Sequence, residues 1–154
     1  MVQTLMDSTY KDGTPLSDEH ICGLLTALLF AGQHTSSITA TWTGLELLHH
    51  PEYLARVMQE QKEVMERFGG EIHFDALKEM QVLHRAVNET LRLHPPLIFL
   101  MRRMMKDMDL NDKIRIPKGD MVVVAPGIGH QNPDVFPNPE GMFPIQVSIC
   151  LTGD

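Results

Sequence analysis

The sequence predicts a mainly α-helical chain with a small β unit, on three observations. Residues 18–50 contain no proline and follow a helix-starting pattern. Two further helical segments come after them, separated by Pro51 and by the pair Gly69 and Gly70. Beyond Pro95 and Pro96, short runs rich in valine and isoleucine alternate with turn residues, as strands do. The expected order is helices first, then the β unit.

The composition is that of a globular protein. Of 154 residues, 43% are hydrophobic and 21% are charged, a balance that supports a packed core. Asp and Glu number 20 against 13 Lys and Arg, with no basic cluster, which argues against a nucleic-acid partner. The N-terminal residues lack the pattern of a signal peptide, and the longest nearly apolar run, 21–31, is shorter than the ~18 residues of a membrane span. We therefore expect a soluble chain.

The first predicted helix is long. Residues 14–19 form a helix start with hydroxyl side chains and two acids, Asp18 and Glu19, near the exposed backbone N–H groups. Nothing stops the helix before Pro51, so we expect about 33 residues, roughly 50 Å at ~1.5 Å per residue. Steps of three and four define one stripe along it, made of Leu24, Leu28, Ala31, Thr35, Ile38, Trp42 and Leu45.

The later elements follow from helix breakers and turn residues. A second helix starts at Pro51 and stops at Gly69, and a third covers Asp75 to about His94. Residues 97–103 form an extended run. Residues 114–126 are predicted to form a hairpin with its turn near 118–119, followed by a loop rich in proline and asparagine.

A polar segment, Gly32 to Ser37, interrupts the apolar long helix. A glycine inside a helix costs roughly 1 kcal/mol against alanine, so Gly32 indicates that something lies close to the backbone there. Thr35 can bond its hydroxyl to the Ala31 carbonyl, or loosen that carbonyl and hold a small ligand in the gap. Each residue alone favours ordinary packing. With His34 beside them, these residues form a polar notch next to an apolar wall.

A second motif is "NETLRLHPP", residues 88–96. Glu89 and Arg92 are three residues apart and therefore share a helix face. The simplest interpretation is an exposed ion pair, whose contribution is roughly 0.2 to 0.5 kcal/mol. The flanking residues Leu91 and Leu93 favour a buried pair instead, where removal of one partner is far more costly.

Together the two motifs resemble the haem-thiolate monooxygenases, the cytochrome P-450 family. "AGQHTS" (31–36) is similar to the oxygen-binding groove of the family's long central helix, and "ETLR" (89–92) to its Glu-x-x-Arg helix. His34 before the groove threonine, where most members have an acid, and "LRLHPPLIFLMR" (91–102) resemble the sterol 14-alpha-demethylase branch. The resemblance implies a partial cytochrome P-450 domain over 1–136, running from the oxygen-groove helix to the β hairpin, and a divergent or truncated tail over 137–154.

The resemblance also implies a chemistry and residue roles. The complete enzyme would bind haem and oxidise a sterol methyl group, using O₂ and NADPH-derived electrons from a reductase. Thr35 and His34 would serve proton delivery, and Gly32 and Thr35 would lie against the haem. Arg102 would meet a haem propionate, while Glu89 and Arg92 would be structural. The residues implied to line the sterol pocket are Leu28, Phe30, Ala31, Leu97, Ile98, Phe99 and Leu100. A complete eukaryotic homologue would be at the endoplasmic reticulum membrane, held there by a part N-terminal to the matched region.

The chain also departs from the family pattern. The family's iron ligand is a cysteine in a glycine-rich loop after a Phe-x-x-Gly pattern. Cys150, in "VSICLTGD", lacks that pattern, and Cys22 lies upstream of the groove, so neither is expected to be the ligand. The loop near 136–143 lacks the basic residue that completes the Glu-x-x-Arg pair. We therefore expect the chain alone to be inactive and its long helix to expose Leu24, Leu28 and Trp42.

Two other readings stay open. Glu46 and His49 have the spacing of a di-iron ligand pair, but that design needs a second Glu-x-x-His, which the sequence lacks. His49 and His50 are better explained as a histidine pair at the negative end of a helix. No metal ligand is assigned on this basis. The second alternative is a non-catalytic helical fragment or interaction module that keeps the family sequence without haem.

Overall fold

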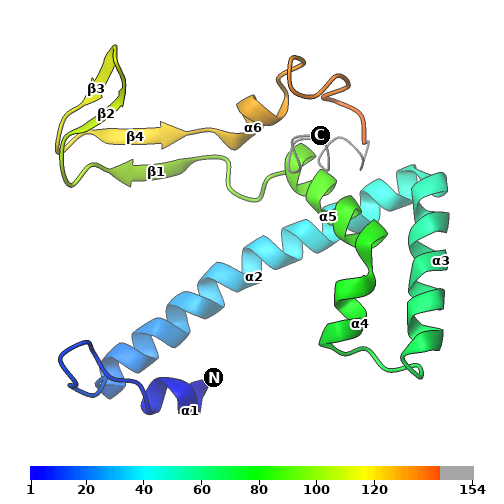
Figure 1. The fold of residues 1–154 in the computed structure, drawn as a ribbon, viewed down its shortest axis with the longest axis horizontal. Helices are drawn as coiled ribbons and strands as arrows, with labels where there is room; N and C mark the ends of the chain where they lie inside the picture. Colours follow the sequence, from blue (N-terminus) through cyan, green and yellow to red (C-terminus); the bar gives the residue numbers. More distant parts are fainter. Residues whose placement is uncertain (143–154) are drawn as a thin grey trace. The chain divides into compact units, whose positions relative to one another are not determined.

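The computed structural model describes residues 1–142. Two compact units divide the chain, residues 1–38 and the residues from 39 onward. Figure 1 labels the helices and strands of both. One helix, α2 (Asp18–His49), begins in the first unit and ends in the second; its 32 residues confirm the predicted long helix. The fold class is also confirmed, because the described elements are mostly helices with two small antiparallel sheets. The predictions about Cys150 and about residues 143–154 of the tail lie outside the described residues.

The first unit contains α1 (Val2–Met6), a loop, and the N-terminal part of α2. Helix α1 was not expected from the sequence. A short bridge between Thr9 and Pro15 closes the loop, and the Tyr10 hydroxyl lies 2.7 Å from Nδ1 of His20 on α2. Ser17 caps α2, since its hydroxyl accepts the backbone N–H of His20 at 3.3 Å. Of the two hydroxyl residues in the predicted helix start, Thr14 and Ser17, the second is therefore the cap.

The apolar character of α2 is spread around the helix, and most of its large side chains are exposed. Leu24 and Leu28 are about half exposed and Trp42 is 38% exposed, as expected from the sequence. Helix α2 is long and apolar enough to cross a membrane. The length of its longest apolar run, 21–31, had predicted that the chain contains no such segment. Core helices of soluble proteins pass the same test, so this property does not separate the two cases.

The second unit packs three helices, α3 (Pro51–Arg67), α4 (Phe74–Glu79) and α5 (Gln81–Leu93). The prediction of one helix from Asp75 to about His94 is wrong, because the chain breaks at Met80, where ψ is 67°. The Met80 side chain is buried with Val64 and Ala76, and a carboxylate from α3 takes the first N–H groups of α5. A second buried cluster joins the helices and contains Leu47, Val57, Ala86 and Met142.

The β unit differs from the predicted hairpin. Strand β4 (Met121–Val124) pairs with β1 (Leu100–Arg103), and β3 (Ile114–Ile116) pairs with β2 (Met108–Asn111), all antiparallel. The turn at Lys118 and Gly119 does form, with Gly119 at φ 99°, but its two flanking strands do not pair with each other. Asn111 explains the difference, because its side-chain oxygen accepts two N–H groups and closes β2 onto β3.

A short helix, α6 (Pro126–His130), follows β4 in a stretch predicted as strand end and loop. Its proline occupies the first turn, where a missing N–H is tolerated. Beyond α6 the described chain passes through Phe136, which is buried, and ends at the buried Met142. Part of the predicted tail therefore packs on the second unit.

Candidate functional site

The polar segment of α2 is a run of hydroxyl groups bonded back to the helix. Thr35 Oγ1 donates to the Ala31 carbonyl at 2.6 Å, Ser36 to the Gly32 carbonyl at 2.5 Å, and Ser37 to the Gln33 carbonyl at 2.7 Å. Each of these carbonyls is thereby offered a side-chain donor in addition to the helical N–H four residues on. Such sharing weakens the regular ladder and is a known cause of local helix bending.

Gly32 and His34 lie on the outside of this segment. No atom of the described residues comes within 4 Å of the position that a Cβ on Gly32 would take. The His34 side chain is exposed, and the Thr35 side chain is partly buried. Beside them on α2, Leu28 and Phe30 are 50% and 71% exposed. The result is a polar notch with open space at the glycine and apolar side chains on either side.

The other residues predicted to line a sterol pocket belong to the second unit. Leu97, Ile98 and Phe99 are more than half exposed, and Leu100 is partly buried. They lead into β1, whose register places Leu100 and Arg102 opposite Val124 and Val122 of β4. Side chains alternate between the two faces of a strand, so Arg102 shares an apolar face with Leu100 and Arg103 takes the other face.

Arg102 is available for an anionic group. Its side chain is exposed, and Nη1 donates only to the adjacent Met101 carbonyl at 2.8 Å. Within residues 1–142 no carboxylate forms an ion pair with it. A guanidinium offers several donors in a planar fork that suits a carboxylate. The structure therefore gives Arg102 the chemistry that a propionate partner needs.

The Glu89 and Arg92 pair is buried, in contrast to an ordinary helix-surface pair. Both side chains lie on α5, at 0% and 3% exposure. Arg92 binds the carboxylate with two parallel bonds, Nε to Oε2 at 2.9 Å and Nη2 to Oε1 at 2.8 Å. This is the bidentate geometry in which an arginine and a carboxylate interact most strongly.

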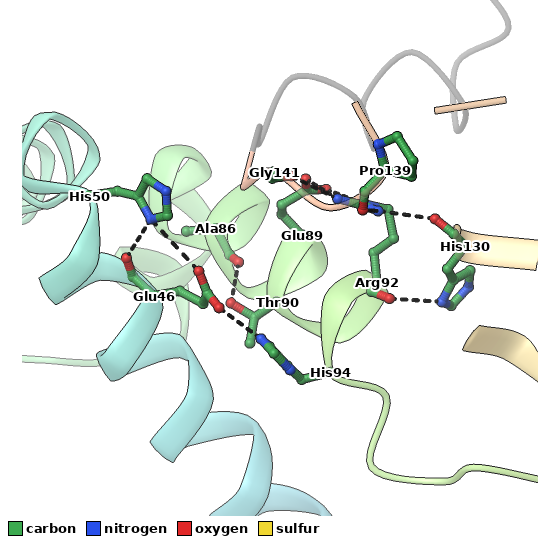
Figure 2. A network of polar contacts seen from close by, with 10 residues as sticks. All are labelled: Glu46, His50, Ala86, Glu89, Thr90, Arg92, His94, His130, Pro139 and Gly141. Carbon is green, nitrogen blue, oxygen red and sulfur yellow. Dashed lines mark hydrogen bonds and ion pairs between the residues drawn. The ribbon is translucent and has the colours of Figure 1, made fainter. Parts of the chain in front are cut away.

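Three backbone carbonyls far along the chain complete the arginine's partners (Figure 2). Nη1 donates to the carbonyls of His130 at 3.0 Å and Pro139 at 2.7 Å, and Nη2 donates to that of Gly141 at 2.9 Å. All five N–H donors of the guanidinium are therefore used. The Phe136 ring lies 5.0 Å from the guanidinium carbon and covers it. The sequence indicated the pair, but it gave no sign of these carbonyls.

A second polar cluster joins the C-terminal ends of α2 and α5, and sequence reasoning missed it. Glu46 Oε1 lies 2.7 Å from Nε2 of His94, and the Trp42 ring stacks on the His94 ring at 3.8 Å with only 10° between the planes (Figure 2 shows the glutamate and histidine). His50 Nδ1 lies 3.6 Å from the other carboxylate oxygen. The spacing of four residues from Trp42 to Glu46 was the available signal, since it places both on one helix face.

This cluster changes the reading of Glu46 and His49. Glu46 faces His94 and His50, whereas His49 points Nδ1 to the Leu45 carbonyl at 3.0 Å. His50 likewise bonds the Glu46 carbonyl at 2.9 Å. Both histidines thus occupy carbonyl groups at the helix end, as their position there favours. In the described part of the chain no group of three histidine, cysteine or acidic side chains could hold a metal ion.

The described residues can be compared with the needs of a haem. The open position at Gly32 and the apolar side chains beside it suit a flat apolar group, and Arg102 suits a propionate. Cys22 is an exposed free thiol, ten residues before Gly32 on the same helix, and therefore about 15 Å away at ~1.5 Å per residue. It is too far to share an iron with this notch, so residues 1–142 supply no axial cysteine thiolate.

Comparisons with known proteins agree with these features. The chain is 47% identical to "Obtusifoliol 14-alpha demethylase" of Triticum aestivum over 148 residues, 94% of this chain and 33% of that protein. It is 43% identical to "Lanosterol 14-alpha demethylase" of Cunninghamella elegans, over 90% of this chain and 28% of that protein. The chain thus spans about a third of the length of the curated relatives it matches.

A solved structure and a family model point the same way. The structure of cyanobacterial CYP120A1 with retinoic acid bound aligns with a TM-score of 0.80 and 29% identity, over 93% of this chain and 32% of that one. The model of the family described as "Cytochrome P450" matches residues 1–144. That match covers nearly the whole chain, and the buried Glu-x-x-Arg pair and the hydroxyl-rich segment of α2 lie within it. The chain belongs to the cytochrome P450 family.

Proposed function

We propose that this chain is part of a haem-dependent monooxygenase that oxidises a sterol methyl group, with O₂ and NADPH-derived electrons from a reductase. The observation that carries the proposal is the notch on α2, where three hydroxyls bond successive carbonyls beside an open glycine. The names of the two relatives described above, "Obtusifoliol 14-alpha demethylase" and "Lanosterol 14-alpha demethylase", support the substrate class. Residues 1–136 would form a partial cytochrome P450 domain, with a divergent tail from 137.

When bound, the haem would supply oxygen activation, and this chain's residues would prepare the surroundings. The Thr35 hydroxyl, held by the Ala31 carbonyl, would hold a proton at Oγ1 for transfer, with the exposed His34 imidazole exchanging protons with solvent. Gly32 would keep side-chain atoms away from the flat face of the cofactor. Arg102 would hold a propionate by a charge-assisted bond.

The apolar residues would bind the sterol and exclude water. Leu28, Phe30 and Ala31 on α2, and residues 97–100 before and at the start of β1, carry exposed apolar surface that suits a sterol skeleton. Glu89 and Arg92 would have no contact with substrate. Their task would be to fix the chain after α6 onto α5.

The proposal includes a membrane setting for a complete eukaryotic protein. A sterol partitions into membranes, and a eukaryotic homologue would be at the endoplasmic reticulum, anchored by a part N-terminal to the matched region. The apolar length of α2 does not bear on this, because we assign that helix to the oxygen groove.

A non-catalytic interaction module is the alternative. The observation that favours it is the chemistry of the described donors, which include no cysteine thiolate near the notch. On this alternative the exposed apolar side chains would bind a protein partner instead of a sterol. The two proposals can be told apart, because only the monooxygenase proposal requires residues 1–142 to work in a complete enzyme.

A hybrid protein makes that test possible. Residues 1–142 would replace the matching segment of the Triticum aestivum relative, and the purified hybrid, with haem, would be assayed with a reductase and a 14-methyl sterol. We expect the 14-demethylated product from the 14-methyl sterol. A sterol that has no 14-methyl group is the control substrate, and we expect it to stay unchanged. A hybrid that holds haem, binds the sterol and is reduced continuously by the reductase, but yields no product, would support the non-catalytic alternative. A Cys22→Ser hybrid is the matched control, and its activity should be unchanged.

A further inference from the structure

The helix that carries the buried arginine begins without a cap of its own. Met80 precedes α5 and makes no side-chain hydrogen bond to it. Instead, the Glu60 carboxylate of α3 accepts two of the N–H groups in the first turn, that of Val82 at Oε1 (2.7 Å) and that of Leu83 at Oε2 (3.0 Å). A carboxylate at the positive end of a helix, with both oxygens used, is a strong capping arrangement.

The other end of α5 is held by a second carboxylate. His94 ends the helix, with its N–H bonded to the Thr90 carbonyl, and its ring lies between Trp42 and Glu46 of α2. The Glu46 side chain is 16% exposed, so little water competes for its 2.7 Å bond to His94. Figure 2 shows this contact beside the Arg92 network.

Glu89 and Arg92 lie between these two contacts. Arg92 must meet carbonyls that come 38, 47 and 49 residues later in the sequence, so its position depends on where α5 sits. Core packing sets the distance between α3 and α5, but hydrophobic contacts are non-directional and oppose sliding and rotation of a helix less sharply than hydrogen bonds do. Directional bonds at both ends resist such movement.

We propose that Glu60 and Glu46 are positioning residues, which fix the two ends of α5 and thereby hold Arg92 within reach of its three carbonyls. Glu60 acts on the backbone N–H groups, and Glu46 acts through the His94 ring. Neither contacts Arg92 itself. The inference goes beyond the proposed function, and only its haem readout depends on that function.

The test uses the haem-containing hybrid with Glu60→Gln, Glu46→Gln, the double variant and Glu63→Gln. A glutamine at position 60 can accept one of the two N–H groups but turns its own donors to the other. Glu63 is the matched control, because it lies on the same helix and binds only the exposed Gln59 side chain, at 2.6 Å. Amide hydrogen exchange, read by peptide, and the rate of haem loss are measured for each.

We expect local effects. Exchange should rise about fivefold to tenfold at 82–85 in Glu60→Gln and at 90–94 in Glu46→Gln, as the loss of a cap implies. In the double variant exchange at 126–130 should also rise and haem should be lost several-fold faster. Peptides from the body of α3 should exchange at the same rate as in the unsubstituted hybrid, which is the parent for these comparisons. Glu63→Gln should match the parent throughout.

Unchanged exchange in α5, or an equal rise in every peptide, would overturn the proposal, since the second result is general destabilisation. If Glu60→Gln does not fold, Glu60→Asp is measured instead, because its shorter side chain keeps the charge and loses one of the two bonds. The exchange result does not require turnover. Loss of sterol product therefore bears on the proposed function alone. Amide exchange in α5 bears on the positioning role of Glu60 and Glu46 alone.

Discussion

A buried arginine is tolerated only when its charge and all its donors are satisfied, and Arg92 meets both conditions. Glu89 supplies the charge, and three carbonyls and a ring from a later part of the chain supply the rest. The spacing of the pair was visible in the sequence. The carbonyls were not, because backbone acceptors have no residue identity and these come from as far as 49 residues away.

Removal of the guanidinium should therefore prevent folding. In the hybrid, Arg92→Ala removes the arginine from the buried ion pair with Glu89, at a cost of about 3 to 5 kcal/mol. Arg92→Lys should fail as well, because an ammonium has three donors where five are used. Arg85→Ala, at an exposed position of the same helix, is the control. Yield of haem-loaded protein is the measurement, and a normal yield for Arg92→Ala would contradict a structural role.

The hydroxyls of α2 look alike in geometry but should differ in function. Thr35→Ala in the hybrid should leave sterol affinity within about twofold, while product formed per O₂ consumed falls about tenfold or more. Ser37→Ala removes a similar bond, 2.7 Å to the Gln33 carbonyl, and should keep normal coupling. Product and oxygen consumption are measured together. Equal coupling in the parent and in Thr35→Ala would mean that the threonine only packs.

At the scale of elements, local signals succeeded where a local cause decides the structure. Proline, the glycine pair and helix-starting side chains fixed the ends of α2 and α3 within a few residues. The break at Met80 was missed, since its cause is Glu60, about twenty residues earlier on another helix. The strand pairing was missed for a similar reason. The turn at Gly119 was correct, but Asn111 and Asp107 determine which strands it joins.

Asp107 organises the β2 and β3 hairpin. It binds Arg115 at 2.7 Å and the Lys118 N–H at 2.8 Å, and the bond from Arg115, then that from Lys118, lowers the pKa of its carboxyl below 3.8. A lowered pKa means that the folded hairpin favours the charged carboxylate. Its contribution to stability is therefore complete above the ordinary pKa and is lost as pH falls through the lowered value.

We expect Asp107→Asn to loosen the hairpin at neutral pH and to remove its response to acid. The measurement is amide exchange of residues 108–118 in the hybrid at pH 7, together with the change in their backbone amide signals between about pH 5 and pH 2, a range that spans the ordinary pKa of an aspartate. Asp112→Asn, in the turn of the same hairpin, is the control. If the hairpin responds to acid in the same way in the unsubstituted hybrid and in Asp107→Asn, Asp107 does not organise the hairpin.

At the scale of the whole molecule, the described residues expose much apolar surface. Phe30 on α2 and Ile98 before β1 are each 71% exposed, far more than is usual for such residues in a stable monomer. The relatives are about three times as long, so in them other segments are available to cover these faces. The sequence predicted this exposure on α2 through the family resemblance and not through the pattern of residues.

The isolated chain of residues 1–154 should therefore associate. We expect it to elute as large species in size-exclusion chromatography without detergent, and to become smaller when Leu29 and Phe30, at 72% and 71% exposure, are changed to Glu. The hybrid should be monodisperse under the same conditions. An isolated chain that elutes as a monomer with Leu29 and Phe30 in place would contradict the expectation.

The reduced carbon monoxide spectrum tests the central claim most directly, which is that residues 1–142 are a working part of a haem-thiolate enzyme whose axial ligand they do not supply. The hybrid and the isolated chain would each be loaded with haem, reduced and exposed to carbon monoxide. We expect a thiolate-type band from the hybrid, retained in Cys22→Ser, and none from the isolated chain. A hybrid that folds and holds haem without that band, or a band from the isolated chain that disappears on Cys150→Ser, would contradict the account.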